Sequence, residues 1–171
     1  MTNKQTGSGP CGWVVNRGAD GGVQSGVAPL PGGHPEEFVC IDVEAAGFNY
    51  KDALACDAHP GVARTLPLVP GIDVAGTLRA AFEGYAAGTP VVATGNGLGE
   101  SVQGGFATEV WAPSAAIIQR PESLTATAAM AMGTAGLTAI LAVERLRAAI
   151  DWEYQSRIQQ DDSLPWLITG A

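Results

Sequence analysis

GFNYKDA (Gly47–Ala53) and LPLVPGIDVAG (Leu66–Gly76) are the two segments from which the architecture of this 171-residue chain is predicted. The second begins with proline-broken apolar residues and ends in a strand-like run that contains a single carboxylate, Asp73. Around them lie short β-prone runs that Gly or Pro separates, as in a compact β domain. These runs are Phe38–Val43, Val69–Leu78, Pro90–Thr94 and Ala107–Ala112.

The segments before and after this β region differ in composition. Residues 1–35 are rich in Gly, Pro and polar side chains, and Trp13–Val15 is the only convincing strand, so we expect this segment to be poorly ordered. After Pro121, Ser123 or Thr125 can cap an Ala-rich helix that we expect to end near Ala149.

Two glycines lie inside this predicted helix, and the chain after it is polar. Gly133 and Gly136 each cost about 1 kcal/mol relative to Ala in a helix, which predicts a close approach by another backbone or a ligand. Residues 151–163 are expected to be an exposed connector, and residues 164–169 (LPWLIT) have the pattern of a buried strand. A helix, a connector and a strand that ends in Gly170 open an α/β unit.

Composition excludes several classes of function. Hydrophobic residues make up 46% and charged residues 15%, which is typical of a globular chain of one domain or of one domain with part of a second. The net charge of −8 argues against a nucleic-acid partner.

The location of the protein is predicted from its cysteines and apolar runs. Three cysteines without C-x-x-C spacing indicate neither a disulfide framework nor a cysteine zinc site, and the polar N-terminus is unlike a signal peptide, so a cytoplasmic protein is expected. The uncharged run Ala126–Val143 has the length of a membrane span, but it is mostly Ala and Thr with two glycines, and no membrane partner is expected.

Three groups of residues together resemble the medium-chain dehydrogenase/reductases, in particular their zinc-free quinone oxidoreductase and acrylyl-CoA reductase branch. They are the two opening segments, then TGNGLGE (Thr94–Glu100) with GGFA (Gly104–Ala107), and finally MGTAGLTA (Met132–Ala139). The resemblance implies a mixed β and α/β fold. It consists of a GroES-like β-barrel catalytic domain over residues 36–122, followed over residues 123–171 by the linking helix and first strand of an incomplete Rossmann domain.

The resemblance also implies that the site contains no metal. Zinc-dependent members place their ligands where this chain has Asn49, Ile72 and Thr134, and isoleucine has no lone pair to offer. The two histidines, His34 and His59, lie in Pro- and Gly-rich loops and are expected to be ordinary surface residues.

Four residues are candidates for the site. Asn49 and Tyr50 match positions that line the nicotinamide pocket in the zinc-free branch, and they are the candidate catalytic residues as well. Thr134 and Thr138, four residues apart, are the further candidates for binding the cofactor. The structural alternatives are an Asn that satisfies a turn, a packed Tyr, and Thr hydroxyls that bond to the preceding helical turn. For Asp52 a helix cap is favoured over chemistry, and for Asp73 the fixing of a loop.

The implied activity is the reduction of an activated double bond by NADPH. Without a metal to polarise a carbonyl, the acceptor must already be conjugated to a quinone or thioester carbonyl, and the cofactor supplies the hydride. The loop that holds the pyrophosphate would follow Ala171, so the cofactor site is expected to be incomplete in this chain. The partner is then a small-molecule substrate, and the resemblance allows a homo-oligomer of the full-length protein. The alternative is a non-catalytic GroES-like binding or scaffold module.

Overall fold

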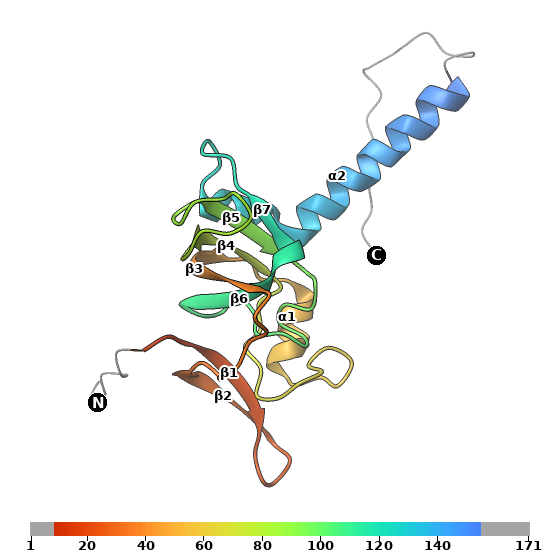
Figure 1. Ribbon diagram of the computed structural model, residues 1–171. Helices are drawn as coiled ribbons and strands as arrows, with labels where there is room; N and C mark the ends of the chain where they lie inside the picture. Colours follow the sequence, from red (N-terminus) through yellow and green to blue (C-terminus); the bar gives the residue numbers. More distant parts are fainter. Residues whose placement is uncertain (1–8, 155–171) are drawn as a thin grey trace. The chain divides into compact units, whose positions relative to one another are not determined.

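The computed structural model describes residues 9–154, with side chains through Ala148. Its centre is a curled antiparallel sheet of five strands in the order β6-β3-β4-β5-β7 (Figure 1). The strands are β3 (Phe38–Ala46), β4 (Asp73–Leu78), β5 (Pro90–Thr94), β6 (Glu109–Pro113) and β7 (Ile117–Gln119).

The core lies against this sheet. Its fully buried members include Ile41 of β3, Val74 of β4 and Val110 of β6, and Leu98 from the loop after β5 packs with them. In β5 and β6 buried residues alternate with half-buried ones, as expected for strands with one face on the core. The predicted β domain is confirmed, with β5 at its predicted bounds.

The N-terminal region differs from the prediction. Besides β1 (Cys11–Arg17), it contains a second strand, β2 (Val23–Pro29), and the two form an antiparallel hairpin. The sequence missed β2 because most of its residues are exposed and it lacks a strong apolar pattern. The backbone N–H groups of Trp13 and Val15 donate to the carbonyls of Phe106 and Leu68 at 2.8 and 2.7 Å, so β1 is attached to the sheet domain.

The part of the chain that the structure describes also contains two α-helices and one short 3-10 helix, η1 (Ser114–Ala116). Helix α1 (Tyr50–Cys56) follows β3, and helix α2 (Ala126–Tyr154) begins after Thr125, whose Oγ1 accepts a hydrogen bond from the Ala128 N–H at 3.1 Å. Thr125 is therefore the helix cap that the sequence predicted as one of two alternatives.

Helix α2 departs from the prediction in two ways. Gly133 is not helical, with φ 47° and ψ −155°, so two helical segments meet at a kink there. The helix also continues to Tyr154, so residues 151–154 are helical and not part of a connector. The predicted connector after them and the predicted strand at residues 164–169 lie outside the described residues.

The chain divides into two units, one ending at Gly136 and the other beginning at Leu137. In the first unit, Ala126, Ala129 and Met130 of α2 pack against Ala75 of β4. In the second unit, Leu137, Ile140, Leu141 and Leu146 are exposed. The helical segment Ala126–Ala148 is long and apolar enough to cross a membrane by length and composition alone. Core helices of soluble proteins meet the same criterion.

Candidate functional site

Asp52 is a fully buried carboxylate that joins the start of α1 to the segment before β4. Its Oδ2 accepts from the backbone N–H of Asn49 at 2.7 Å, and its Oδ1 accepts from the N–H groups of Gly71 and Ile72 at 3.1 and 2.9 Å. Asp52 therefore helps to cap the helix, as predicted, as the N3 residue of a capping box in which the side chain of Asn49, the N-cap, accepts from the Asp52 backbone N–H. It also holds the loop that leads into β4.

Asp73, the first residue of β4, is the second fully buried carboxylate. Its Oδ2 accepts from the Asn49 side-chain Nδ2 at 2.9 Å and from the Thr134 backbone N–H at 2.7 Å, while its Oδ1 accepts from the Thr134 hydroxyl at 2.6 Å. Charge-assisted bonds of this kind are the stronger ones in proteins. One carboxylate thus gathers two segments that are 24 and 61 residues away from it in sequence.

Gly133 makes this approach of Asp73 to α2 possible. A Cβ at Gly133 would lie 2.6 Å from Oδ2 of Asp73, and the φ of +47° is one that residues with a side chain seldom adopt. A close approach does explain this glycine, but the approaching group is the Asp73 side chain and not the backbone or ligand that was predicted. Gly136 has no comparable neighbour among the described residues, since an added Cβ would contact only Met132 of its own helix.

The glycines of GGFA allow two loops to cross closely. The N–H groups of Gly104, Gly105 and Phe106 donate to the carbonyls of Val69, Gly71 and Pro70 at 2.7, 2.8 and 2.9 Å. A Cβ at Gly104 would lie 2.5 Å from the Gly71 oxygen. The segments GFNYKDA, LPLVPGIDVAG and GGFA, which the sequence marked separately, therefore form one hydrogen-bonded structure.

Two exposed aromatic side chains, Phe48 and Tyr50, flank Asn49 in the sequence. Tyr50 is 81% exposed and Phe48 71% exposed, on either side of the partly buried Asn49 in sequence. The rings of Phe48 and Phe106 are parallel, with centroids 5.9 Å apart. The Lys51 ammonium pairs with Glu100, which connects α1 to the loop after β5. Neither Phe48 nor Phe106 was a candidate from sequence, although Phe48 is an apolar aromatic residue directly before the candidate Asn49, and such a neighbour is a signal for a binding surface.

The four candidate residues have different outcomes. Asn49 and Thr134 are brought together on Asp73. Tyr50 follows Asn49 as the first residue of α1 and is largely exposed, so it is not the packed Tyr of the structural alternative. Thr138 belongs to the second unit, where it is exposed on α2. The roles of all four in catalysis or cofactor binding stay predictions.

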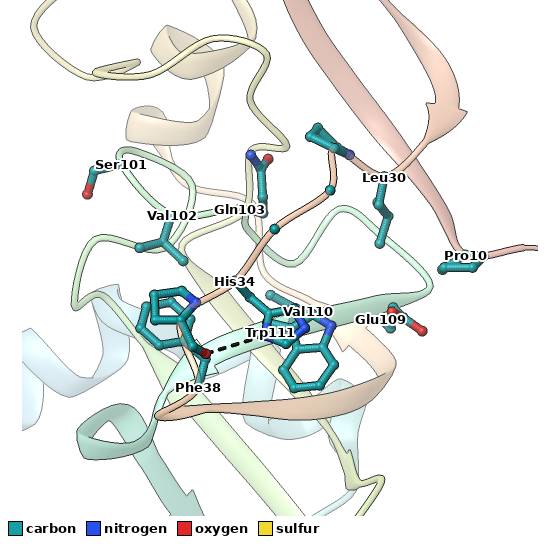
Figure 2. A pocket seen from close by; sticks show the side chains of 14 residues that line it. Pro10, Leu30, His34, Phe38, Ser101, Val102, Gln103, Glu109, Val110 and Trp111 are labelled. Carbon is teal, nitrogen blue, oxygen red and sulfur yellow. Dashed lines mark hydrogen bonds between the residues drawn. The ribbon is translucent and has the colours of Figure 1, made fainter.

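A separate hollow of about 330 Å³ lies among the loop after β2, the loop at residues 101–103 and strand β6 (Figure 2). Within it the His34 ring stacks on Trp111, with centroids 3.4 Å apart and planes 8° apart. None of the four candidate residues lines this hollow. His34 and His59 are both exposed, as expected for surface residues.

The described residues contain no group of three or more His, Cys, Asp or Glu side chains arranged to hold a metal ion. The cysteines are reduced, and burial raises the pKa of the Cys40 thiol to about 11. Burial, with the nearby carboxylates Asp52 and Asp57, also raises the pKa of Cys56.

Comparison with known proteins places this chain in a family. Residues 35–122 match the alcohol dehydrogenase GroES-like domain. The chain is 41% identical to the probable acrylyl-CoA reductase AcuI of Escherichia coli K12 over 116 residues, which cover 67% of this chain and 36% of that protein. It is also 41% identical to the putative quinone oxidoreductase YhfP of Bacillus subtilis over 113 residues, which cover 66% of this chain and 34% of that protein.

Solved structures agree with this assignment. The yhdH oxidoreductase of Salmonella enterica, in complex with NADP, superposes with a TM-score of 0.75 at 35% identity, over 81% of this chain and 43% of that one. The Bacillus subtilis protein yhfP, with NAD bound, gives a TM-score of 0.74 at 33% identity, over 90% of this chain and 45% of that one. The chain spans about a third of the length of the curated relatives it matches. It belongs to the alcohol dehydrogenase GroES-like domain family and, within the medium-chain dehydrogenase/reductases, to the quinone oxidoreductase and acrylyl-CoA reductase branch.

Proposed function

We propose that this chain forms the substrate side of an oxidoreductase that uses NADPH, without zinc, to reduce a double bond conjugated to a thioester or quinone carbonyl. The observation that carries the proposal is the convergence of Asn49 and Thr134 on Asp73, because a candidate from the nicotinamide-pocket pair and a candidate from the linking helix meet at one carboxylate. The names of the relatives, an acrylyl-CoA reductase and a quinone oxidoreductase, support the substrate class.

The proposal excludes zinc on the chemistry of the donor set. Of the three positions at which zinc-dependent members place ligands, Ile72 has no donor atom, and the Thr134 hydroxyl donates to Asp73. At the third position the Asn49 amide nitrogen already lies between two carboxylates, 2.9 Å from Asp73 and 3.3 Å from Asp52. An amide nitrogen therefore occupies the place where a cation would have to pair with these carboxylates.

The residues fit the nicotinamide end of a dinucleotide. Asn49 and Thr134 offer polar atoms at fixed positions, and the missing side chain of Gly133 leaves room for the Asp73 carboxylate that fixes them. NADPH, when bound, supplies the hydride that such a reduction needs. Structural neighbours with NADP and with NAD bound support a nicotinamide cofactor, and the choice of NADPH is part of the proposal.

The chain's own residues then position the reactants. Asn49 orients the nicotinamide end, and the parallel rings of Phe48 and Phe106 offer an apolar surface for a planar conjugated acceptor. Tyr50, exposed at the start of α1, is placed to contact the substrate. Hydride addition at the β carbon leaves a proton to be added at the α carbon, and the Tyr50 hydroxyl is the candidate group to hold it.

The cellular location and the partners of the protein are inferred from composition and from the resemblance to the family. We infer a cytoplasmic protein with a small-molecule substrate and neither nucleic-acid nor membrane partners. The net charge of −8 supports the absence of a nucleic-acid partner. The Ala- and Thr-rich composition of α2 supports the absence of a membrane partner. A homo-oligomer of the full-length protein rests on the resemblance alone.

The test compares NADPH oxidation by this chain and by a version extended through a Rossmann domain, with acrylyl-CoA and with a simple quinone as acceptors. The extended version is expected to be active and the chain alone inactive, because the backbone amides that anchor the pyrophosphate belong to the Rossmann domain. Activity of the short chain equal to that of the long one would refute the proposed division of the site. Inactivity of both would favour the alternative, a non-catalytic GroES-like module.

A further inference from the structure

The orientation of the Asn49 amide is set by its neighbours. Its Nδ2 lies 2.9 Å from Oδ2 of Asp73 and 3.3 Å from Oδ2 of Asp52. A carboxylate oxygen accepts hydrogen bonds and has none to donate, so the nitrogen of the amide, and not its oxygen, must face this pair. The two acceptors account for the two N–H groups of the amide.

The same Asp73 fixes the second segment of the site. It accepts from the backbone N–H and the hydroxyl of Thr134, and the missing side chain at Gly133 leaves room for its Oδ2. A shift of this carboxylate would therefore move Asn49 and the start of the second helical segment of α2 together. Because Asp73 is fully buried, it acts on any bound molecule only through these partners.

We propose that Asp73 is a positioning residue of this site, and that it holds the Asn49 amide so that only the carbonyl oxygen faces a bound molecule. One lone pair of this oxygen serves the backbone N–H of Asp52 in the capping box, and the other is left to accept from the bound molecule. The proposal rests on the proposed function and deepens it. Asn49 then selects a group that donates a hydrogen bond, such as the carboxamide N–H of a nicotinamide. It does not stabilise negative charge that develops on a substrate carbonyl, because two acceptor oxygens repel each other. Asn49 thus orients the cofactor, and charge on the substrate must be met by other groups.

The first measurement concerns the amide itself, in the isotope-labelled 171-residue chain by nuclear magnetic resonance. Both side-chain N–H groups of Asn49 are expected to exchange with solvent more slowly than those of Asn16, which is exposed. A scalar coupling across the hydrogen bond from Nδ2 of Asn49 to Cγ of Asp73 is also expected. Exchange as fast as that of Asn16, with no such coupling, would overturn the proposal without any variant.

Variants separate positioning from folding. Asp73→Ala is expected to shift the Asn49 side-chain signals and to abolish their protection. Asp73→Asn can keep an oxygen toward Asn49 and should preserve most of the protection. Thr134→Val is the matched control, because it removes one hydrogen bond to Asp73 and leaves the bond to Asn49. Equal loss of protection in all three variants would indicate a merely structural role. Should Asp73→Ala not fold, the unmodified chain and Asp73→Asn still decide the question.

The second measurement tests the direction of hydrogen bonding to the ligand. NADP⁺ is compared with its 3-acetylpyridine analogue, in which a methyl ketone replaces the carboxamide and removes the donor. The version extended through a Rossmann domain is expected to bind NADP⁺ roughly two- to tenfold more tightly, the range of one net hydrogen bond, and Asp73→Ala in that version should lose this preference. Equal affinity of the extended version for both nucleotides would overturn the acceptor role.

Failure of the proposed function gives a different pattern. In that case neither nucleotide perturbs the Asn49 signals of the extended version at any concentration, while the exchange and coupling data still report whether Asp73 holds the amide. A slow, coupled amide without nucleotide binding would refute the nicotinamide site and leave the positioning by Asp73 standing. A fast, uncoupled amide with nucleotide binding would refute the positioning by Asp73 and leave the nicotinamide site standing.

Discussion

Replacing Asp52 with Ala tests whether one buried carboxylate holds the site segments together. In the structure it accepts from three backbone N–H groups, those of Asn49, Gly71 and Ile72, at 2.7, 3.1 and 2.9 Å. Gly71 and Ile72 are buried, so water cannot readily replace the lost acceptor there. A buried donor without a partner costs about 1–3 kcal/mol, so for the two buried donors we expect a total loss of about 2–6 kcal/mol.

This loss is large relative to the stability of a domain, which is typically about 5–15 kcal/mol. Equilibrium unfolding in urea measures it. With a slope of about 2 kcal/mol per molar urea, the midpoint should fall by about 1–3 M. Asp52→Asn, which keeps one oxygen, is expected to fall between Asp52→Ala and the unmodified chain.

The matched control is Asp42→Ala, on the exposed face of β3. Asp42 pairs with Arg79, is about half exposed, and leaves Arg79 paired with Glu109 when it is removed. An exposed pair contributes about 0–1 kcal/mol, so the midpoint should move little. If Asp52→Ala shifts the midpoint no more than Asp42→Ala does, the inference that Asp52 holds α1 to the loop before β4 is wrong.

Three further predictions concern other features of the chain. Gly133→Ala should destabilise the chain by about 2 kcal/mol or more, because Gly133 has a positive φ and an added Cβ would lie 2.6 Å from Asp73. Gly136→Ala is the control, and it should change the free energy of unfolding by no more than about 1 kcal/mol. Equal unfolding midpoints of the two variants would contradict this prediction. Since burial raises the pKa of Cys40 to about 11 from a usual value of 9.0, its reactive thiolate at pH 8 is about a hundredfold scarcer than in an ordinary thiol. Iodoacetamide should therefore label Cys40 last, at a rate that rises about tenfold per pH unit up to its pKa, and mass spectrometry showing early labelling would refute this. Elemental analysis of the purified chain should find no stoichiometric zinc, and one zinc per chain retained through chelator treatment would overturn the reading of the site.

Much of the sheet could be predicted from local pattern. Pro90–Thr94 is a strand at the predicted bounds, and Phe38 begins the strand that was predicted from it. These segments combine β-prone residues with Gly or Pro at their ends, so local preference and the fold agree. Thr125 caps α2 for the same reason, because a cap acts within a single helical turn.

Elements that depend on a distant partner were missed or misplaced. Strand β2 exists because β1 pairs with it along its whole length, although its own residues are mostly exposed. The predicted strand from Val69 begins only at Asp73, since Gly71 has a φ of +110° and the loop that contains it is hydrogen-bonded to residues 104–106. Such pairings lie outside any local window of sequence.

For the site, too, sequence and tertiary structure each supplied a different part of the answer. The types of residue at Asn49, Tyr50 and Thr134, with their flanking motifs, identified the candidates and indicated the branch of the family from sequence alone. Only the tertiary structure showed that Asn49 and Thr134 meet on Asp73, that Gly133 kinks α2 to allow it, and that Thr138 falls in the second unit. The reason is physical: a buried carboxylate must collect hydrogen-bond donors from whichever segments the fold brings to it, and their separation in sequence leaves no periodic signal.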